Sequence, residues 1–217
     1  MKNLQTIKSV VFDLDGTLMS SSSTIYKCTL KTFQEFNIAA DLPEEEFNKK
    51  IGYHFKDIFD DFNISVPDLE NFIDKYKSLY FDFINESVIY PNVLDTLDHL
   101  KNKSLYTSLL TTKAQDQAEK ILEHFSLKDY FFIIMGRRNG MAIKPAPDAL
   151  LRICEQTGIA PGQTLMVGDS ELDIQCGKNA GALTCGVTFG YREKEQLQKE
   201  NPDFLISDMK ELIEIVA

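Results

Sequence analysis

Six short segments of the chain are predominantly apolar, without alternation between apolar and polar residues. Runs of this kind and length are typical of strands buried on both faces of a parallel sheet. The expected strands cover residues 10–12, 105–110, 131–135, 164–167, 183–187 and 204–206.

Segments with helical spacing of apolar residues separate most of these strands. Residues 91–100 place Leu94, Leu97 and Leu100 on one stripe, and Pro91 stands at an expected first helical position. Comparable helices are expected at 114–125, 148–157, 171–180 and 208–216. Alternation of strands and helices predicts an α/β fold with a doubly wound parallel sheet.

One long segment, residues 20–87, breaks this alternation because it contains no convincing strand. Helices are expected at 24–36, 43–50 and 55–62. Apolar residues from 67 to 87 predict one amphipathic helix of about five turns: Leu69, Phe72, Ile73, Tyr76, Leu79, Tyr80, Phe83 and Ile84. The pattern predicts a core domain (1–18 and 88–217) and an inserted helical domain (19–87), with a hinge in the serine run 20–23.

Composition narrows the classes of partner. The chain has 217 residues, and its net charge is −10. Nucleic acids and anionic membranes attract clustered Lys and Arg, so neither is an expected partner. No run of 18 apolar residues occurs, so no transmembrane helix is expected. The four cysteines (28, 154, 176 and 185) lack paired spacing and predict reduced thiols in a cytoplasmic protein.

The first expected strand ends on two carboxylates, Asp13 and Asp15, and Gly16 and Thr17 follow. Ligands bind at the carboxyl ends of strands in open α/β sheets. Two carboxylates so close repel each other, so the pair is typical of a site that binds a cation or keeps one carboxyl protonated. An Asp-rich surface turn with Gly is the alternative interpretation.

Three further motifs follow in order. Thr111 and Thr112 end the second apolar strand, Lys144 begins the sequence K-P-A-P-D, and Asp169 lies in G-D-S-E-L-D, which ends at Asp173. Together with D-L-D-G-T, this set resembles the motifs of the haloacid dehalogenase-like superfamily, and the resemblance spans nearly the whole chain. The superfamily implies a Rossmann-like core with an inserted helical cap domain.

The resemblance implies a role for each motif. Asp13 would attack the phosphoryl group, and Asp15 would act as general acid and base. Thr111 would bind a phosphoryl oxygen, and Lys144 would neutralise both Asp13 and the transferred group. The phosphate cradle would also include Thr112 and the backbone N–H groups of Leu14, Asp15 and Gly16.

The same resemblance implies Mg²⁺ as cofactor, because a hard cation prefers carboxylate, carbonyl and phosphate oxygens. Its expected ligands are the Asp13 side chain, the Asp15 backbone carbonyl and the Asp169 side chain. Asp173 would hold a metal-bound water or orient a ligand. The alternative for Asp173 is an exposed acid near a helix N-terminus.

The expected function is a Mg²⁺-dependent phosphatase that hydrolyses a small phosphorylated metabolite through an aspartyl-phosphate. Residues 187–191 (V-T-F-G-Y) resemble the phosphoglycolate phosphatase branch. A sugar-phosphate mutase of the same fold usually carries a His where the cap begins, and Ile25 stands there. A dehalogenase lacks the second carboxylate, which Asp15 supplies.

A non-catalytic binding protein on this scaffold, the rival from another class, would have lost Asp13 or Asp15. Specificity is expected to come from the helical domain, with Tyr53, His54 and Lys56 as candidate contacts. A monomer or a homodimer is expected.

Overall fold

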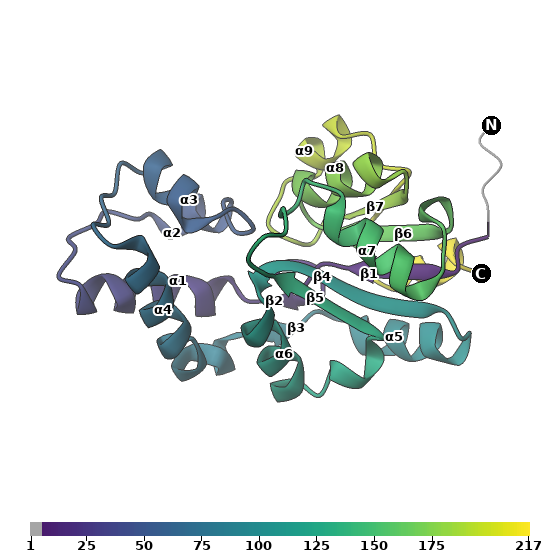
Figure 1. Cartoon of the computed structure of the whole chain (residues 1–217), viewed down its shortest axis with the longest axis horizontal. Coiled ribbons are helices and arrows are strands. Elements are labelled where there is room, and N and C mark those ends of the chain that lie inside the picture. Colours follow the sequence, from purple (N-terminus) through teal and green to yellow (C-terminus); the bar gives the residue numbers. More distant parts are fainter. Residues whose placement is uncertain (1–5) are drawn as a thin grey trace.

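The computed structural model describes residues 6–217 and contains one six-stranded parallel sheet (Figure 1). The strand order is β5-β4-β1-β6-β7-β8. All six strands predicted from the sequence are present: β1 Ser9–Phe12, β4 Tyr106–Ala114, β5 Ile133–Arg137, β6 Thr164–Gly168, β7 Leu183–Val187 and β8 Phe204–Ile206. The chain order reverses at β1, which pairs with β4 on one side and β6 on the other. That arrangement opens a crevice beyond the carboxyl end of β1.

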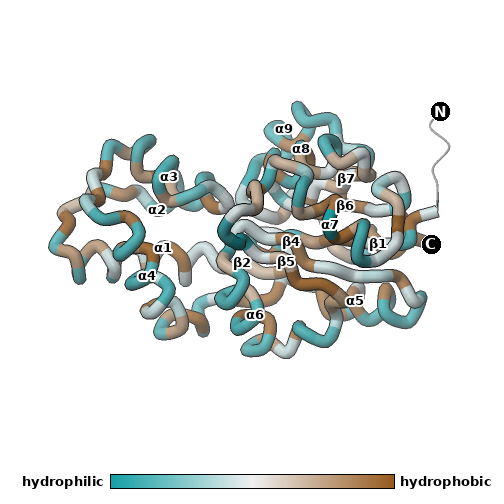
Figure 2. The backbone as a smooth tube through the Cα atoms, viewed as in Figure 1, coloured by the Kyte–Doolittle hydropathy of each residue, from teal (hydrophilic) through white to brown (hydrophobic). Residues whose placement is uncertain are grey.

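Helices cover both faces of the sheet, which confirms the doubly wound α/β prediction. Val10 and Phe12 of β1 belong to the larger hydrophobic cluster, whereas Val11 belongs to a second cluster on the other face. Residues 10–12 of β1 are therefore all apolar, because both faces of the strand are buried (Figure 2). The covering helices are α5 Val93–Asn102, α6 Gln115–His124, α7 Asp148–Thr157, α8 Glu171–Ala180, α9 Lys194–Lys199 and α10 Glu211–Ile215.

Two of these helices differ from the prediction in detail, and α9 was not predicted. Helix α5 begins at Val93, because Asn92 adopts a left-handed backbone (φ 63°) that ends the preceding turn. Pro91 therefore precedes the helix, and Leu94 is 43% exposed while Val93 is buried. Helix α10 begins only at Glu211, whose carboxylate accepts from the backbone N–H groups of residues 207 and 208.

The inserted segment is helical, as predicted. It contains α1 Ser22–Glu35, α2 Glu44–Asn48, α3 Phe55–Asp61 and α4 Leu69–Tyr80. Rings of Phe33, Phe55, Phe59 and Phe72 pack with centroids 5.2–5.9 Å apart and form its centre.

The single helix predicted for residues 67–87 is wrong in its second part. α4 ends at Tyr80, and Phe81–Glu86 form a 3₁₀ helix. A spacing of three residues suits both kinds of helix, so apolar periodicity did not separate them. The Thr24 hydroxyl donates to the Phe83 carbonyl oxygen (3.0 Å) and fixes this turn against α1.

A short antiparallel pair, β2 Met19–Ser20 with β3 Val88–Ile89, joins the two ends of the inserted segment. Two residues are too few to produce a recognisable pattern, so sequence reasoning missed both strands. Ser20 lies in β2 and Ser21 is buried beside α1, so the serine run predicted as a hinge begins within this pair. No helix among residues 6–217 is long and apolar enough to cross a membrane. The remaining 3₁₀ turns are Lys128–Tyr130 and Pro161–Gln163.

Candidate active site

The predicted motif residues meet at the carboxyl edge of the sheet. Asp13 follows β1, Thr111 lies in β4, and Asp169 follows β6, all neighbouring strands. Lys144 reaches the same place from the loop between β5 and α7. Residues up to 160 positions apart along the chain therefore share one buried site.

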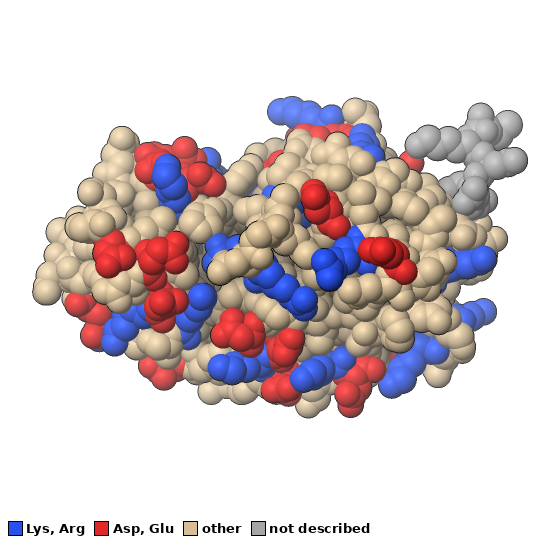
Figure 3. Space-filling model, in the orientation of Figure 1, with Lys and Arg blue, Asp and Glu red and all other residues tan. Residues whose placement is uncertain are grey.

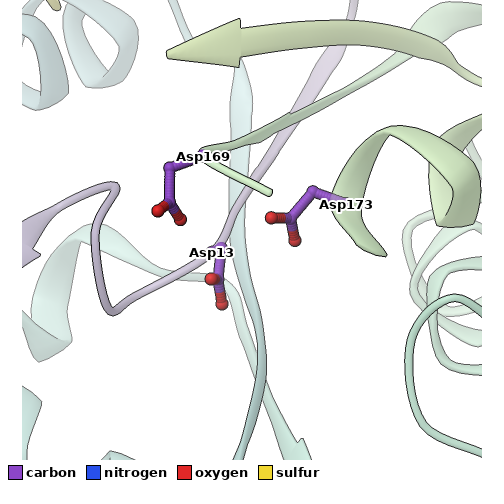
Figure 4. Close-up of side chains that lie close together, drawn as sticks. All are labelled: Asp13, Asp169 and Asp173. Atoms are coloured by element: carbon purple, nitrogen blue, oxygen red, sulfur yellow. The ribbon is translucent and has the colours of Figure 1, made fainter. Parts of the chain in front are cut away.

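Three carboxylates form the centre of this site. Asp13, Asp169 and Asp173 each place one oxygen within 4.8 Å of the others, and all three residues are buried (Figure 4). Burial, with a smaller contribution from the neighbouring carboxylates, raises the pKa of Asp13 to about 7 and that of Asp169 to about 8. Each group resists ionisation because it shares a dry site with others of its charge.

Lys144 is the cation that the carboxylates share. Its ammonium lies 2.8 Å from Asp13 Oδ1 and 2.6 Å from Asp173 Oδ1, and it donates to the Leu110 carbonyl oxygen (3.1 Å). Burial lowers the pKa of Lys144, but Asp13 and Asp173 outweigh that effect and raise it above its ordinary value. When all three carboxyl groups are ionised, the cluster and the Lys144 ammonium together have a charge of −2, which a divalent cation balances.

Asp173 is fully buried, so the alternative of an exposed helix acid is wrong. One of its oxygens pairs with Lys144, and the other accepts from the backbone N–H (3.1 Å) and hydroxyl (2.6 Å) of Ser170. The second contact caps the N-terminus of α8. Asp173 therefore ties the orientation of Lys144 to the start of a helix.

The Asp169 carboxylate accepts two hydrogen bonds and packs closely against two glycines, and sequence reasoning identified none of these contacts. Its Oδ2 accepts from the Tyr191 N–H (2.8 Å), and its Oδ1 accepts from the Thr17 hydroxyl (3.3 Å). A Cβ added at Gly16 would lie 2.3 Å from Asp169 Oδ2, and one at Gly190 would lie 2.2 Å from Asp169 Cβ. The two glycines leave just the space that the carboxylate fills.

Asp15 has two partners that the sequence did not reveal. The Lys113 ammonium donates to Asp15 Oδ2 (2.8 Å) and Oδ1 (3.0 Å). The Ser21 hydroxyl donates to Oδ1, and the Tyr191 hydroxyl lies 3.1 Å from that of Ser21. The Asp15 carboxylate is thus held from the end of β4 and from the start of α1.

The groups predicted to bind phosphate differ in whether they already form hydrogen bonds within the protein. The Thr111 hydroxyl is buried and accepts from the Lys113 N–H (3.2 Å). The Gly16 N–H donates to the Met19 carbonyl oxygen (2.8 Å) and is thereby committed to the turn. Leu14 is buried in the same turn, and Thr112 lies on the wall of an adjoining cavity.

That cavity, of about 100 Å³, lies between the sheet and the helical segment, next to Asp15. Tyr53 and His54 line it, as the sequence suggested. Lys56 pairs instead with Asp60 (2.7 Å) on the exposed side of α3. The Tyr53 hydroxyl donates to Glu171 (2.5 Å), which Arg192 also binds, so the helical segment contacts the sheet domain beside the Asp169 loop.

Comparisons with known proteins agree with this geometry. Residues 10–187 match the family model described as "Haloacid dehalogenase-like hydrolase". Phosphoglycolate phosphatase from Vibrio parahaemolyticus is 32% identical over 98% of this chain and 97% of its own length. Pyrophosphatase PpaX from Bacillus pumilus is 32% identical over 99% of both chains.

A solved structure shares the whole fold. The crystal structure of a predicted phosphatase from Clostridium acetobutylicum is 29% identical, with a TM-score of 0.83, and the match covers 98% of this chain and 99% of that one. The similarity therefore includes the helical segment as well as the sheet.

Proposed function

The chain belongs to the haloacid dehalogenase-like hydrolase family, and from this we propose that it is a Mg²⁺-dependent phosphatase acting on a small phosphorylated metabolite. The observation that carries the proposal is the buried cluster of Asp13, Asp169 and Asp173 around Lys144. Its charge of −2 and its oxygen donors suit a hard divalent cation. Relatives named phosphoglycolate phosphatase and pyrophosphatase support the same reaction class.

The cation would be held by the side chains of Asp13 and Asp169 and by the backbone carbonyl of Asp15. Bound Mg²⁺ supplies charge screening, which lets an anionic nucleophile approach an anionic phosphoryl group. Asp173 orients Lys144, whose ammonium neutralises Asp13 and the phosphoryl oxygens. Thr111 donates its hydroxyl to one of those oxygens.

The reaction proceeds in two steps. A carboxylate oxygen of Asp13 attacks phosphorus, and the bond to the leaving oxygen breaks, which gives an aspartyl-phosphate. Asp15 gives a proton to the leaving oxygen, and then takes one from the water that attacks the aspartyl-phosphate. Inorganic phosphate leaves and Asp13 is regenerated.

We propose the division into a core domain (1–18 and 88–217) and a cap domain (19–87). The β2–β3 pair brings both connections together, so residues 21–87 can rotate as one body over the site. The cavity between the two parts holds the leaving group. A cytoplasmic protein fits the four buried thiols, and the proposed partner is a small metabolite rather than nucleic acid or membrane.

The test is release of inorganic phosphate from a panel of small phosphate esters, with Mg²⁺ and with a chelator. Glucose 1-phosphate belongs in the panel because a mutase would convert it to glucose 6-phosphate. Ile25, which lines the cavity and is 7% exposed, cannot donate a hydrogen bond to Asp15. We therefore expect free phosphate and no isomerisation. Full turnover without metal, or efficient isomerisation, would refute the proposal.

A further inference from the structure

The cavity beside Asp15 limits the size of the leaving group. It measures about 100 Å³. An apolar cavity of about 150 Å³ takes up benzene, which has six non-hydrogen atoms, so the present one takes a group of about four to five. A two-carbon acid or a phosphate has that size, whereas a hexose has more than twice as many atoms. The walls from the helical segment are apolar and include Phe47, Ile58 and Ile73.

The charge of the cavity is opposite to that of the chain. The chain carries −10, yet Lys77, Lys113 and Arg137 line the cavity and Asp15 is its single carboxylate within the described range 6–217. Lys and Arg side chains also gather where the helical segment meets the sheet (Figure 3). Cations that outnumber acids on a cavity wall favour an anionic occupant.

Two of these cations come from neighbouring strand ends. Arg137 ends β5 opposite Ala114, the residue that follows Lys113 at the end of β4. The Arg137 guanidinium forms no ion pair with any residue from 6 to 217, although acids are abundant in the chain. Lys77, from α4, lies 3.5 Å from Asp74 and is already partly neutralised.

Lys113 is the most buried of the three cations. Its side chain is 8% exposed, and its ammonium lies 4.9 Å from the centroid of the Tyr80 ring. A lysine has three N–H donors, and Asp15 accepts from two directions only. In so dry a site, its charge acts strongly on any group that enters beside Asp15.

We propose that Lys113 and Arg137 form a cationic subsite that binds a second negative charge on the substrate, carried by a leaving group of about five non-hydrogen atoms. The proposal rests on the proposed phosphatase function, because the leaving group must lie beside Asp15. A carboxylate and a second phosphate share this chemistry. Lys113 and Arg137 are thus specificity-determining residues, and larger uncharged esters are poor substrates.

Three small two-carbon esters that differ in the charge of the leaving group test the subsite. The leaving group is anionic in 2-phosphoglycolate, neutral in ethyl phosphate and cationic in O-phosphoethanolamine. We expect kcat/KM of the wild-type protein to fall at least tenfold at each step of this series. Pyrophosphate is tested separately, because it shows whether the subsite binds a second phosphate instead of a carboxylate. A preference for either anionic substrate over the neutral and cationic esters supports the proposal.

Single substitutions test which residues cause the preference for an anionic leaving group. Lys113→Met keeps the length of the side chain and removes its charge, and should lower the ratio of kcat/KM for 2-phosphoglycolate over ethyl phosphate at least tenfold. Arg137→Met should lower it less, and Lys113→Arg should retain most of it. Lys120→Met, on the exposed surface of α6, is the matched control and should leave it unchanged.

The ratio of kcat/KM for 2-phosphoglycolate over ethyl phosphate shows whether Lys113 recognises the leaving group or only positions Asp15. If Lys113 only positioned Asp15, Lys113→Met would slow all three esters equally, and the unchanged ratio would overturn the subsite. Equal wild-type activity on all three esters, or activity only on larger sugar phosphates, would also overturn it while the phosphatase function stood. Absence of phosphate release by the wild-type protein from every ester and from pyrophosphate would refute the proposed function itself.

Discussion

The ammonium of Lys113 lies 2.8 Å and 3.0 Å from the two carboxylate oxygens of Asp15, although 98 positions separate the residues. The sequence, with Ile25 where related mutases carry a His, gave no reason to expect a restraint on Asp15. The structure shows that this carboxylate is held from two sides, by Lys113 and by Ser21. The proposed general acid and base is therefore oriented before any substrate arrives.

Asp13→Asn should abolish turnover without loss of fold stability. An amide fills the same space but does not attack phosphorus, so we expect activity below about 1% of wild type, since catalytic effects span several orders of magnitude. The substitution also removes one of three buried carboxylates, whose ionisation burial opposes. Phosphate release and thermal unfolding of the metal-free protein are the measurements. Activity near that of wild type would refute Asp13 as nucleophile.

Stability of the metal-free protein should fall as pH rises from about 4 to about 8. Burial raises the pKa of Asp13 to about 7 and of Asp169 to about 8. A raised folded-state pKa means that the folded state binds more protons than the unfolded state. The resulting stabilisation is complete below pH 4 and disappears as pH rises through 7 to 8, by up to about 1.4 kcal/mol per pH unit for each proton.

Mg²⁺ should reverse this trend, because its ligands must be deprotonated before they bind. The stabilisation by Mg²⁺ should grow from pH 6 to pH 9, and calorimetry near pH 7 should detect proton release on binding. Thermal unfolding with and without the metal across this range measures the effect. An increment in Tm that does not change with pH would contradict the proposed metal site.

Gly190→Ala should weaken Mg²⁺ binding and lower activity by at least 100-fold. The added Cβ would lie 2.2 Å from Asp169 Cβ and 2.5 Å from the Gly16 carbonyl oxygen, so the carboxylate must move. Gly158→Ala is the control: nothing lies within 4 Å of its added Cβ, but its φ of +69° disfavours alanine. It should cost about 1 kcal/mol of stability and keep full activity. Equal activity of the two variants would count against close packing around Asp169.

Tyr53→Phe should raise KM three- to tenfold and leave kcat close to that of wild type. The Tyr53 hydroxyl donates to Glu171, and this hydrogen bond crosses from the helical segment to the sheet domain. Loss of one solvent-exposed hydrogen bond costs about 0.5–1.5 kcal/mol, here from the contact between the helical segment and the sheet. Steady-state kinetics measure the change, with Tyr106→Phe, a half-exposed tyrosine of β4, as the control. An unchanged KM would show that the hydrogen bond between Tyr53 and Glu171 does not contribute to substrate binding.

Local patterns were enough to predict the sheet, whereas the carboxylate cluster was expected from the resemblance of the motifs to those of the family. The strands are apolar because they are buried on both faces, and Asp13, Asp169 and Asp173 each lie in a short motif directly after a strand. The roles of these residues came from family resemblance. The partners of Asp15 were beyond local patterns, because Lys113 and Ser21 come from elements whose side chains converge only in the folded chain.

Other misses have similar physical causes. The β2–β3 pair is too short to leave a pattern, and a 3₁₀ turn shares its spacing of three with an α-helix. The start of α5 at Val93 depends on the left-handed backbone of Asn92, whose side chain donates to Asp208 from across the fold. Tertiary contacts, rather than propensity, decided each of these boundaries.

Trapping of the covalent intermediate tests the central claim most directly. Asp15→Asn removes the base that activates water. Acetyl phosphate needs no acid to expel acetate, which is small enough for the cavity beside Asp15, so the aspartyl-phosphate should form and persist. The measurement is mass spectrometry of the acid-quenched variant after mixing with this substrate and Mg²⁺. The account predicts one phosphoryl group on the peptide that contains Asp13, and none in the presence of chelator. Release of acetate with Asp13 unmodified, or with the phosphoryl group on another residue, would contradict it.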